Sequence, residues 1–120
     1  MPIWPRLKSM VGGDGTITPK TVAAATTLRV PDDLAVVRLT GTATVTSLTA
    51  APQTRGRLVW FVQSDSGTTT LTNSPGTTTV GQMDLGGLDP ANTELGPSDW
   101  ILLYLKSDGT WVRVMAATNN

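Results

Sequence analysis

Short apolar runs separated by turn-forming residues fill most of the chain after residue 16. The runs are rich in valine, leucine and threonine, and glycine, proline, asparagine or aspartate bounds them, which is the pattern of strands and turns. No segment shows the convincing i, i+3, i+4 spacing of an amphipathic helix. The sequence therefore predicts strands at 26–30, 34–39, 40–46, 57–63, 68–72 and 77–80, followed by a terminal hairpin.

The terminal hairpin is the clearest predicted element. Two apolar runs, WILLYL and WVRVMAA, flank a tight turn at SDG. An Asp-Gly pair between apolar strands is a strong hairpin signal, because both turn positions tolerate positive φ. Before the hairpin, residues 81–98 are rich in glycine, proline and aspartate. They predict a long loop, and long loops in compact domains are often functional or form interfaces.

A threonine occupies every second position from Thr40 to Thr46, with small residues between. Flat threonine rows also suit ice-binding surfaces, but those surfaces need stacked coils of fixed length, and the threonine rows of this chain are unevenly spaced. We therefore expect the threonines to face water or pair across strands, and Ala43 and Val45 to face another sheet or subunit. The alternation slips at Leu48, which predicts a bulge or bend there.

The strand pattern predicts an all-β fold. We expect residues 17–120 to form a compact antiparallel sandwich or barrel-like knob of about eight short strands, and residues 1–16 to form an extended N-terminal arm. The 57–63 strand is almost continuously apolar, so we expect it to be covered on both faces. No repeat has a constant period, and a long solenoid is therefore not predicted.

The N-terminal arm is more apolar than a solvated tail usually is. Pro2 and Pro5 disfavour a regular helix, and GGDG at 12–15 is a flexible break. The apolar and basic residues that would make the contacts are Ile3, Trp4, Arg6, Leu7, Lys8 and Met10. Such an arm can fold back onto its own domain, or dock on another subunit or a host surface.

Composition excludes several classes of function. The formal net charge is +0 at pH 7, so the chain has no long-range field that would attract nucleic acid. Cysteine and histidine are both absent, which removes disulfides, thiol nucleophiles, the usual zinc ligands and the common neutral-pH base. No apolar run approaches the roughly 20 residues of a membrane helix. We therefore expect no enzyme activity, cofactor, metal, nucleic-acid partner or membrane partner.

Carboxylates in and beside the long loop are the remaining candidates for chemistry. Asp84, Asp89, Glu94 and Asp99 cluster in the sequence and could bind calcium or supply a glycosidase pair. Their spacing matches no EF-hand pattern, and carboxylates in loops are usually only solvated. We therefore expect neither calcium binding nor hydrolysis.

Basic and aromatic side chains supply two further candidates. Arg55 and Arg57 stand at the entry to the 57–63 strand, where they are either solvated or grip an acidic partner. Trp60 lies in the continuous apolar run and is expected in the core. Trp100 and Trp111 lie near the ends of the hairpin strands, where they predict cross-strand or inter-subunit packing. A sugar-binding platform is the alternative.

Four stretches together resemble a β-rich module of tailed-bacteriophage virion proteins. They read LTGTATVTSLTA (39–50), RGRLVWFVQ (55–63), TTTLTNSPG (68–76) and DWILLYLKSDGTWVRV (99–114). Trp60 and Phe61 stand where the module has its strand aromatic, and Trp111 closes its DG-x-W motif. The module occurs in small head-decoration or head-fibre proteins and near the ends of tail fibres. The resemblance covers about residues 34–115, and the 81–98 stretch departs from it.

The resemblance implies a trimeric, β-rich knob and a structural role. The chain is expected to bind the capsid exterior as a decoration or head-fibre protein, with the arm residues as anchor and the major capsid protein and its own copies as partners. The expected subunit interface comprises Ala43, Val45, Trp100 and Trp111. The alternative is a tail-fibre or baseplate tip that binds a host receptor or surface glycan through Trp100 or the 81–98 loop.

Overall fold

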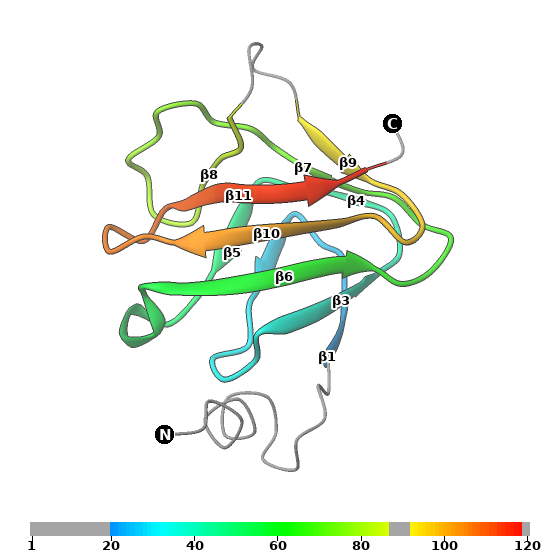
Figure 1. The fold of residues 1–120 in the computed structure, drawn as a ribbon, viewed down its shortest axis with the longest axis horizontal. Helices are drawn as coiled ribbons and strands as arrows, with labels where there is room; N and C mark the ends of the chain where they lie inside the picture. Colours follow the sequence, from blue (N-terminus) through cyan, green and yellow to red (C-terminus); the bar gives the residue numbers. More distant parts are fainter. Residues whose placement is uncertain (1–19, 87–91, 119–120) are drawn as a thin grey trace.

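The computed structural model describes residues 20–86 and 92–118. Within these ranges the chain is all-β and has no α-helix, as the sequence predicts (Figure 1). The strands are β1 (Lys20–Ala23), β2 (Thr27–Arg29), β3 (Val36–Thr40), β4 (Ala43–Val45), β5 (Ser47–Thr49), β6 (Arg57–Gln63), β7 (Thr69–Leu71), β8 (Met83–Asp84), β9 (Thr93–Leu95), β10 (Trp100–Leu105) and β11 (Trp111–Ala117). One 3-10 turn, η1 (Pro52–Thr54), precedes β6.

Successive turns of the chain stack on one another in a solenoid-like arrangement. In the six-stranded sheet, whose order is β1-β3-β6-β10-β11-β8, β3 lies parallel to both β1 and β6. On the other sides of the stack, β5 lies parallel to β2 and β7 lies parallel to β4. The expected antiparallel sandwich is therefore wrong, because the first turns of the chain stack in parallel instead of folding into hairpins.

The turns that stack have unequal lengths. Lys20 pairs with Val37, 17 positions later, whereas Val36 pairs with Trp60, 24 positions later. The β2–β5 and β4–β7 pairs are 20 and 26 positions apart. Because the corners absorb these differences, the sequence shows no constant period although the strands stack in register. This is why the absence of a repeat did not exclude a solenoid-like stack.

The last part of the chain runs against the stack. β9 pairs antiparallel with β7, and β10 pairs antiparallel with β6, so both follow the earlier strands in the reverse direction. β10 then turns back into β11 through Ser107–Gly109, where Gly109 has a φ of +87°. The predicted hairpin at the Asp108-Gly109 turn is confirmed. β11 pairs with the short β8 at the edge of the sheet.

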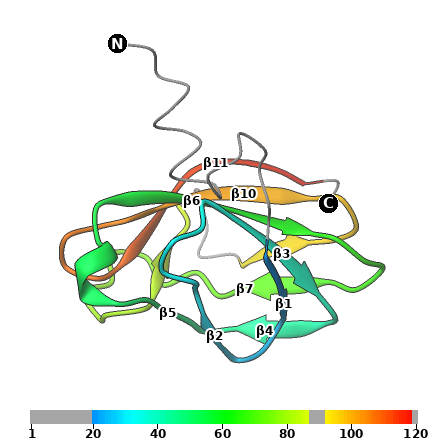
Figure 2. The same cartoon turned by 90° about the horizontal axis from the view of Figure 1, so that it is seen from below.

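The core lies between the six-stranded sheet and the strands behind it. Figure 2 shows β6, β10 and β11 in one layer and β2, β4 and β5 in the other. Phe61 and Trp111 are fully buried between the layers, with ring centroids 6.1 Å apart in an edge-to-face arrangement. The core consists of Leu28, Val30, Val37, Leu39, Val45, Leu48, Val59, Phe61, Leu71, Met83, Leu85, Leu95, Ile101, Leu103, Leu105 and Trp111.

A corner at Thr46 separates β4 from β5. The two strands belong to different sheets, although only one residue lies between them. The Thr46 backbone N–H and hydroxyl both donate to the carbonyl oxygen of Thr26, at 2.8 and 3.2 Å. Val45 and Leu48, on the two sides of the corner, both point into the core. The predicted bend is thus present, and its corner residue lies two positions before Leu48.

Candidate functional site

The side of the six-stranded sheet that faces away from the core is apolar as well. Strand pairing aligns its side chains in cross-strand rows, because residues opposite each other on neighbouring strands share a face. The rows are Leu58, Tyr104, Val112 and Asp84; Val36, Trp60, Leu102 and Met115; and Thr21, Arg38, Val62, Trp100 and Ala117. We call this surface the outer face. It carries two charged side chains within these rows, Arg38 on β3 and Asp84 on the edge strand β8.

A β-bulge in β11 enlarges the outer face. Leu102 pairs with Met115 and Leu103 pairs with Arg113, which leaves Val114 as an extra residue between them. The extra residue locally disrupts the ladder and bends the strand. Val114 is 50% exposed and Met115 is 49% exposed, and across the sheet Leu58 is also 49% exposed. Half-exposed aliphatic side chains thus lie on β6 and on β11, the two strands that flank β10.

Two tryptophans form the centre of the outer face. The rings of Trp60 and Trp100 have centroids 4.8 Å apart at an interplanar angle of 57°. Both side chains are only partly buried. The expectation that Trp60 packs in the core is wrong, because β6 alternates between buried and partly exposed residues and Trp60 lies on the outward set. For the same reason the chain's own described residues cover β6 on one face only.

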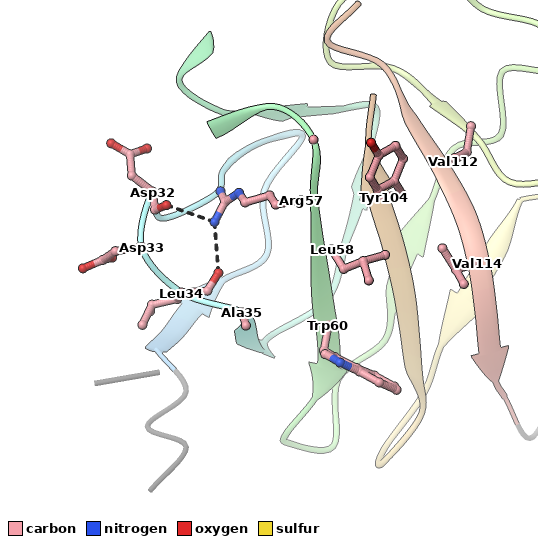
Figure 3. A pocket seen from close by; sticks show the side chains of 11 residues that line it. Asp32, Asp33, Leu34, Ala35, Arg57, Leu58, Trp60, Tyr104, Val112 and Val114 are labelled. Atoms are coloured by element: carbon pink, nitrogen blue, oxygen red, sulfur yellow. Dashed lines mark hydrogen bonds between the residues drawn. The ribbon is translucent and has the colours of Figure 1, made fainter. Parts of the chain in front are cut away.

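A groove runs along one end of the outer face (Figure 3). Its volume is about 940 Å³. The floor is apolar and comes from β6, β10 and β11, and the wall comes from the loop between β2 and β3. The lining residues are Asp32, Asp33, Leu34, Ala35, Gly56, Arg57, Leu58, Trp60, Tyr104, Val112 and Val114. The groove therefore joins an apolar floor to an acidic rim.

Arg57 holds the wall of the groove in place. Its guanidinium donates to the carbonyl oxygens of Pro31, Asp32 and Leu34, at 2.8, 3.1 and 3.0 Å. Figure 3 shows the bonds to Asp32 and Leu34. Burial lowers the pKa of this guanidinium, against the opposing charges of Asp32 and Asp33. A bound partner is not needed to explain Arg57, since its charge stabilises three backbone carbonyls of its own chain.

The two aspartates of the rim have different surroundings. Asp32 accepts a hydrogen bond from Arg29 at 2.9 Å, an exposed pair of opposite charges. Asp33 is exposed, and among residues 20–86 and 92–118 it has no hydrogen bond or ion pair. One carboxylate at the edge of the apolar floor is thus left available for a basic group.

The expected subunit-interface residues do not come together. Val45 and Trp111 are fully buried in the chain's own core, so their assignment to a subunit interface is wrong. Their side chains fill the space between the layers and cannot reach a partner. Ala43 is partly exposed on β4, in the layer behind, and Trp100 is partly exposed on the outer face. Of the four, Trp100 alone belongs to the outer face.

The arm residues expected to bind the capsid lie outside the described residues. These are Ile3, Trp4, Arg6, Leu7, Lys8 and Met10. The structure begins at Lys20, so the expected boundary between the arm and the body also lies outside it. The anchoring role of the arm stays a prediction.

The clustered carboxylates that lie within the structure support turns. Asp84 accepts from the backbone N–H groups of Gly76 and Gly86, at 3.1 and 3.2 Å. Asp99 is buried and accepts from the backbone N–H of Gly96 at 2.9 Å. Glu94 lies opposite Thr70 in the β7–β9 pair, and Asp89 is not described. Residues 20–86 and 92–118 contain no group of three or more acidic or other ligating side chains that could hold a metal.

The outer face is the feature that sequence reasoning missed. Its signal is present in RLVWFVQ and WILLYL, where both alternating sets of side chains are apolar. Such runs do not distinguish a strand buried on both sides from a strand with one apolar face left uncovered. Among residues 20–86 and 92–118, the structure shows the second arrangement.

The functional interpretation rests on the geometry of the outer face and the groove, because the comparisons with known proteins give no match. No protein-family model matches the chain, and no curated protein or solved structure matches it. In the part of the chain that the structure describes, no helix is long and apolar enough to cross a membrane. The groove and the apolar rows of the outer face are the candidate functional site.

Proposed function

We propose that the chain is a structural protein of a tailed-phage virion that binds the capsid exterior as a decoration or head-fibre protein and stabilises the shell. The observation that carries this proposal is the outer face, which presents three largely apolar rows with two charges among them. An uncovered apolar surface of this breadth fits contact with another protein. The resemblance of residues 34–115 to virion modules selects the phage particle as the setting.

The proposal includes a homotrimer whose copies meet at the Trp100 end of the outer face. Trp100 and Tyr104 lie at opposite ends of β10, so the Trp100 end is separate from the end of the groove beside Tyr104. Ala117, which pairs with Trp100, is exposed and small, and it allows another chain to approach closely. Burying aromatic and aliphatic side chains between copies is the usual means of stabilising an obligate assembly.

Sedimentation of the purified full chain tests the trimer. We expect the mass of three chains at micromolar concentration. Ala117→Glu places a charge in the Trp100 row and should give a monomer, because an unpaired carboxylate is costly to bury. The matched control is Thr44→Glu, an exposed position on β4 in the layer behind, which should leave three chains together. A wild-type monomer would contradict the trimer.

Binding to particles tests the shell role. Full-length protein is mixed with capsids that lack it, and pelleted protein is measured together with the resistance of the shell to heat. We expect saturable binding and a more heat-resistant shell. Binding should weaken when Met115→Glu adds a charge to the outer face, and Thr44→Glu should bind as wild type does. Protein found only on purified tails would overturn the capsid assignment.

A tail-fibre or baseplate tip is the second candidate, and the exposed aromatic rings favour it. Trp60, Trp100 and Tyr104 lie on one open face, and sugars stack on such rings. Binding of the isolated protein to host-cell glycans, lost in Trp100→Ala and kept in Thr44→Glu, would support this function. Normal host adsorption by particles that lack the protein would exclude it.

A further inference from the structure

The groove has an apolar floor that the described residues leave open. Leu58 and Val114 are half-exposed on its two sides, and Tyr104 lies between them (Figure 3). Apolar surface of this kind is costly in water unless another segment or molecule covers it. The occupant has to be mainly apolar and has to tolerate or prefer the acidic rim at Asp32 and Asp33.

The N-terminal segment has the matching chemistry. Residues 3–11 read IWPRLKSMV, with five apolar side chains and two basic ones, Arg6 and Lys8. The apolar side chains suit the floor, and either basic group can reach a carboxylate at the rim. Asp33 is the natural acceptor, because it is exposed and without a hydrogen bond or ion pair to any described residue.

The position of Lys20 allows this segment to reach the groove of its own chain. β1 belongs to the same sheet as the groove floor, and one strand, β3, separates it from β6. Strands are spaced by about 4.8 Å, so β6 is about 10 Å from β1. Residues 12–19 can span up to about 26 Å when extended, which is more than enough. A tether this short raises the effective concentration of the segment at its own groove to about the millimolar range.

We propose that residues 3–11 occupy the groove of their own chain in the free protein, with a basic side chain of the segment paired to Asp33. The segment covers Leu58 and Val114, and the groove in turn shields the segment's apolar side chains. Any partner that uses either surface then has to compete with this internal contact. The proposal concerns the isolated protein and is independent of its role in the virion.

Disulfide trapping tests the proposal in the full chain. The protein contains no cysteine, so Leu7→Cys combined with Leu58→Cys has only two thiols. The matched control combines Leu7→Cys with Thr44→Cys on the opposite layer. Under mild oxidation at low protein concentration, we expect the first pair to close within one chain at least about tenfold faster than the control pair. Non-reducing peptide mapping distinguishes links within a chain from links between chains.

The outcomes distinguish the chain's own N-terminal segment from the segment of a second copy, and both from an empty groove. Equal rates in the two pairs would show that the segment does not settle on the groove. A fast product linked between chains would show that the segment of a second copy, and not its own, fills the groove. Asp33→Lys, added to the first pair, should slow closure severalfold at low salt, and an unchanged rate would overturn the pairing with Asp33. None of these measurements uses a capsid. The isolated protein can therefore show the internal contact even if it does not bind the shell, and it can bind the shell even if the internal contact is absent.

Discussion

The indole Nε1 of Trp111 donates a hydrogen bond to the carbonyl oxygen of Leu48, 3.0 Å away and 63 positions earlier in the chain. Both residues are buried, and the bond connects the terminal hairpin to the corner between the two sheets behind it. Trp111 also packs edge-to-face against Phe61 of β6. A single side chain thus connects three parts of the core.

Trp111→Phe tests how much this connection contributes to the free energy of unfolding. The change removes the donor and part of the ring, so it should lower the free energy of unfolding by about 2–4 kcal/mol. The measurement is urea unfolding followed by circular dichroism. Trp100→Phe is the control: Trp100 is only partly buried, and we expect a loss below about 1 kcal/mol. Equal losses in the two variants would contradict the assigned role of the Nε1 hydrogen bond.

Gly67→Ala should destabilise the protein through a backbone collision. A Cβ at this position would overlap the carbonyl group of Gly41, which is backbone and cannot rotate away. We expect a loss of about 1–3 kcal/mol in unfolding free energy. At Gly96 an added Cβ would make only an ordinary contact, 3.5 Å from Asp99 Oδ2, so Gly96→Ala should cost less. The reverse order would be incompatible with the close approach of the two loops.

Asp65 should make the free energy of unfolding depend on pH in the acid range. Its carboxylate accepts from the backbone N–H groups of Gly41 and Gly67, at 2.8 and 2.9 Å, and these bonds lower its pKa. A lowered folded-state pKa means that the stabilisation is present above the ordinary carboxyl pKa and is lost as pH falls through the folded value. Asp65→Asn should therefore be less stable than wild type at pH 7, and the difference should shrink below about pH 4. A constant difference from pH 7 to pH 2, read from urea midpoints, would refute this linkage.

Ser98→Gly should stabilise the turn before β10. Ser98 has a φ of +69°, while Asp99 N–H bonds to the Gly96 carbonyl 2.9 Å away across the turn. A side chain in this left-handed region is strained, and glycine relieves that strain. After allowing for the flexibility that glycine adds to the unfolded chain, we expect a gain of about 0.5 kcal/mol in the thermal-unfolding analysis. Ser98→Ala keeps the Cβ and should show no gain.

The local features of the fold could be predicted because their signals lie within a few residues. The Asp108-Gly109 pair specifies the hairpin, and the slip in alternation marks the corner at Thr46. The parallel stack depends on pairings such as Val36 with Trp60, which join positions 24 residues apart with no constant period. No pattern in a single sequence marks such a pairing when the corners differ in length.

The candidate site was harder to predict, and the reasons differ between residues. The apolar neighbours of Trp60 predict a core position, and the sequence cannot show that the described residues cover β6 on one face only. Arg57 was an ambiguous surface cation because its three acceptors are backbone carbonyls, which leave no side-chain signal. Trp100 lies on the outer face, and its role at a subunit interface stays a prediction. Val45, beside the corner, and Trp111, in the hairpin, are buried in the core.

Because β9 and β10 are reversed, the two ends of the stack differ in how they can pair with a strand from another chain. A strand from another chain that continued the parallel direction could pair beside β1 or β2, each of which has one neighbour among the described residues. At the opposite end, β9 and β10 occupy the edges of β7 and β6 in the reverse direction, so a reversed strand directly follows the parallel pairs there. A coil from another chain can therefore continue the parallel pairing directly beside β1 and β2, whereas at the other end it meets the reversed β9 or the short β8 first.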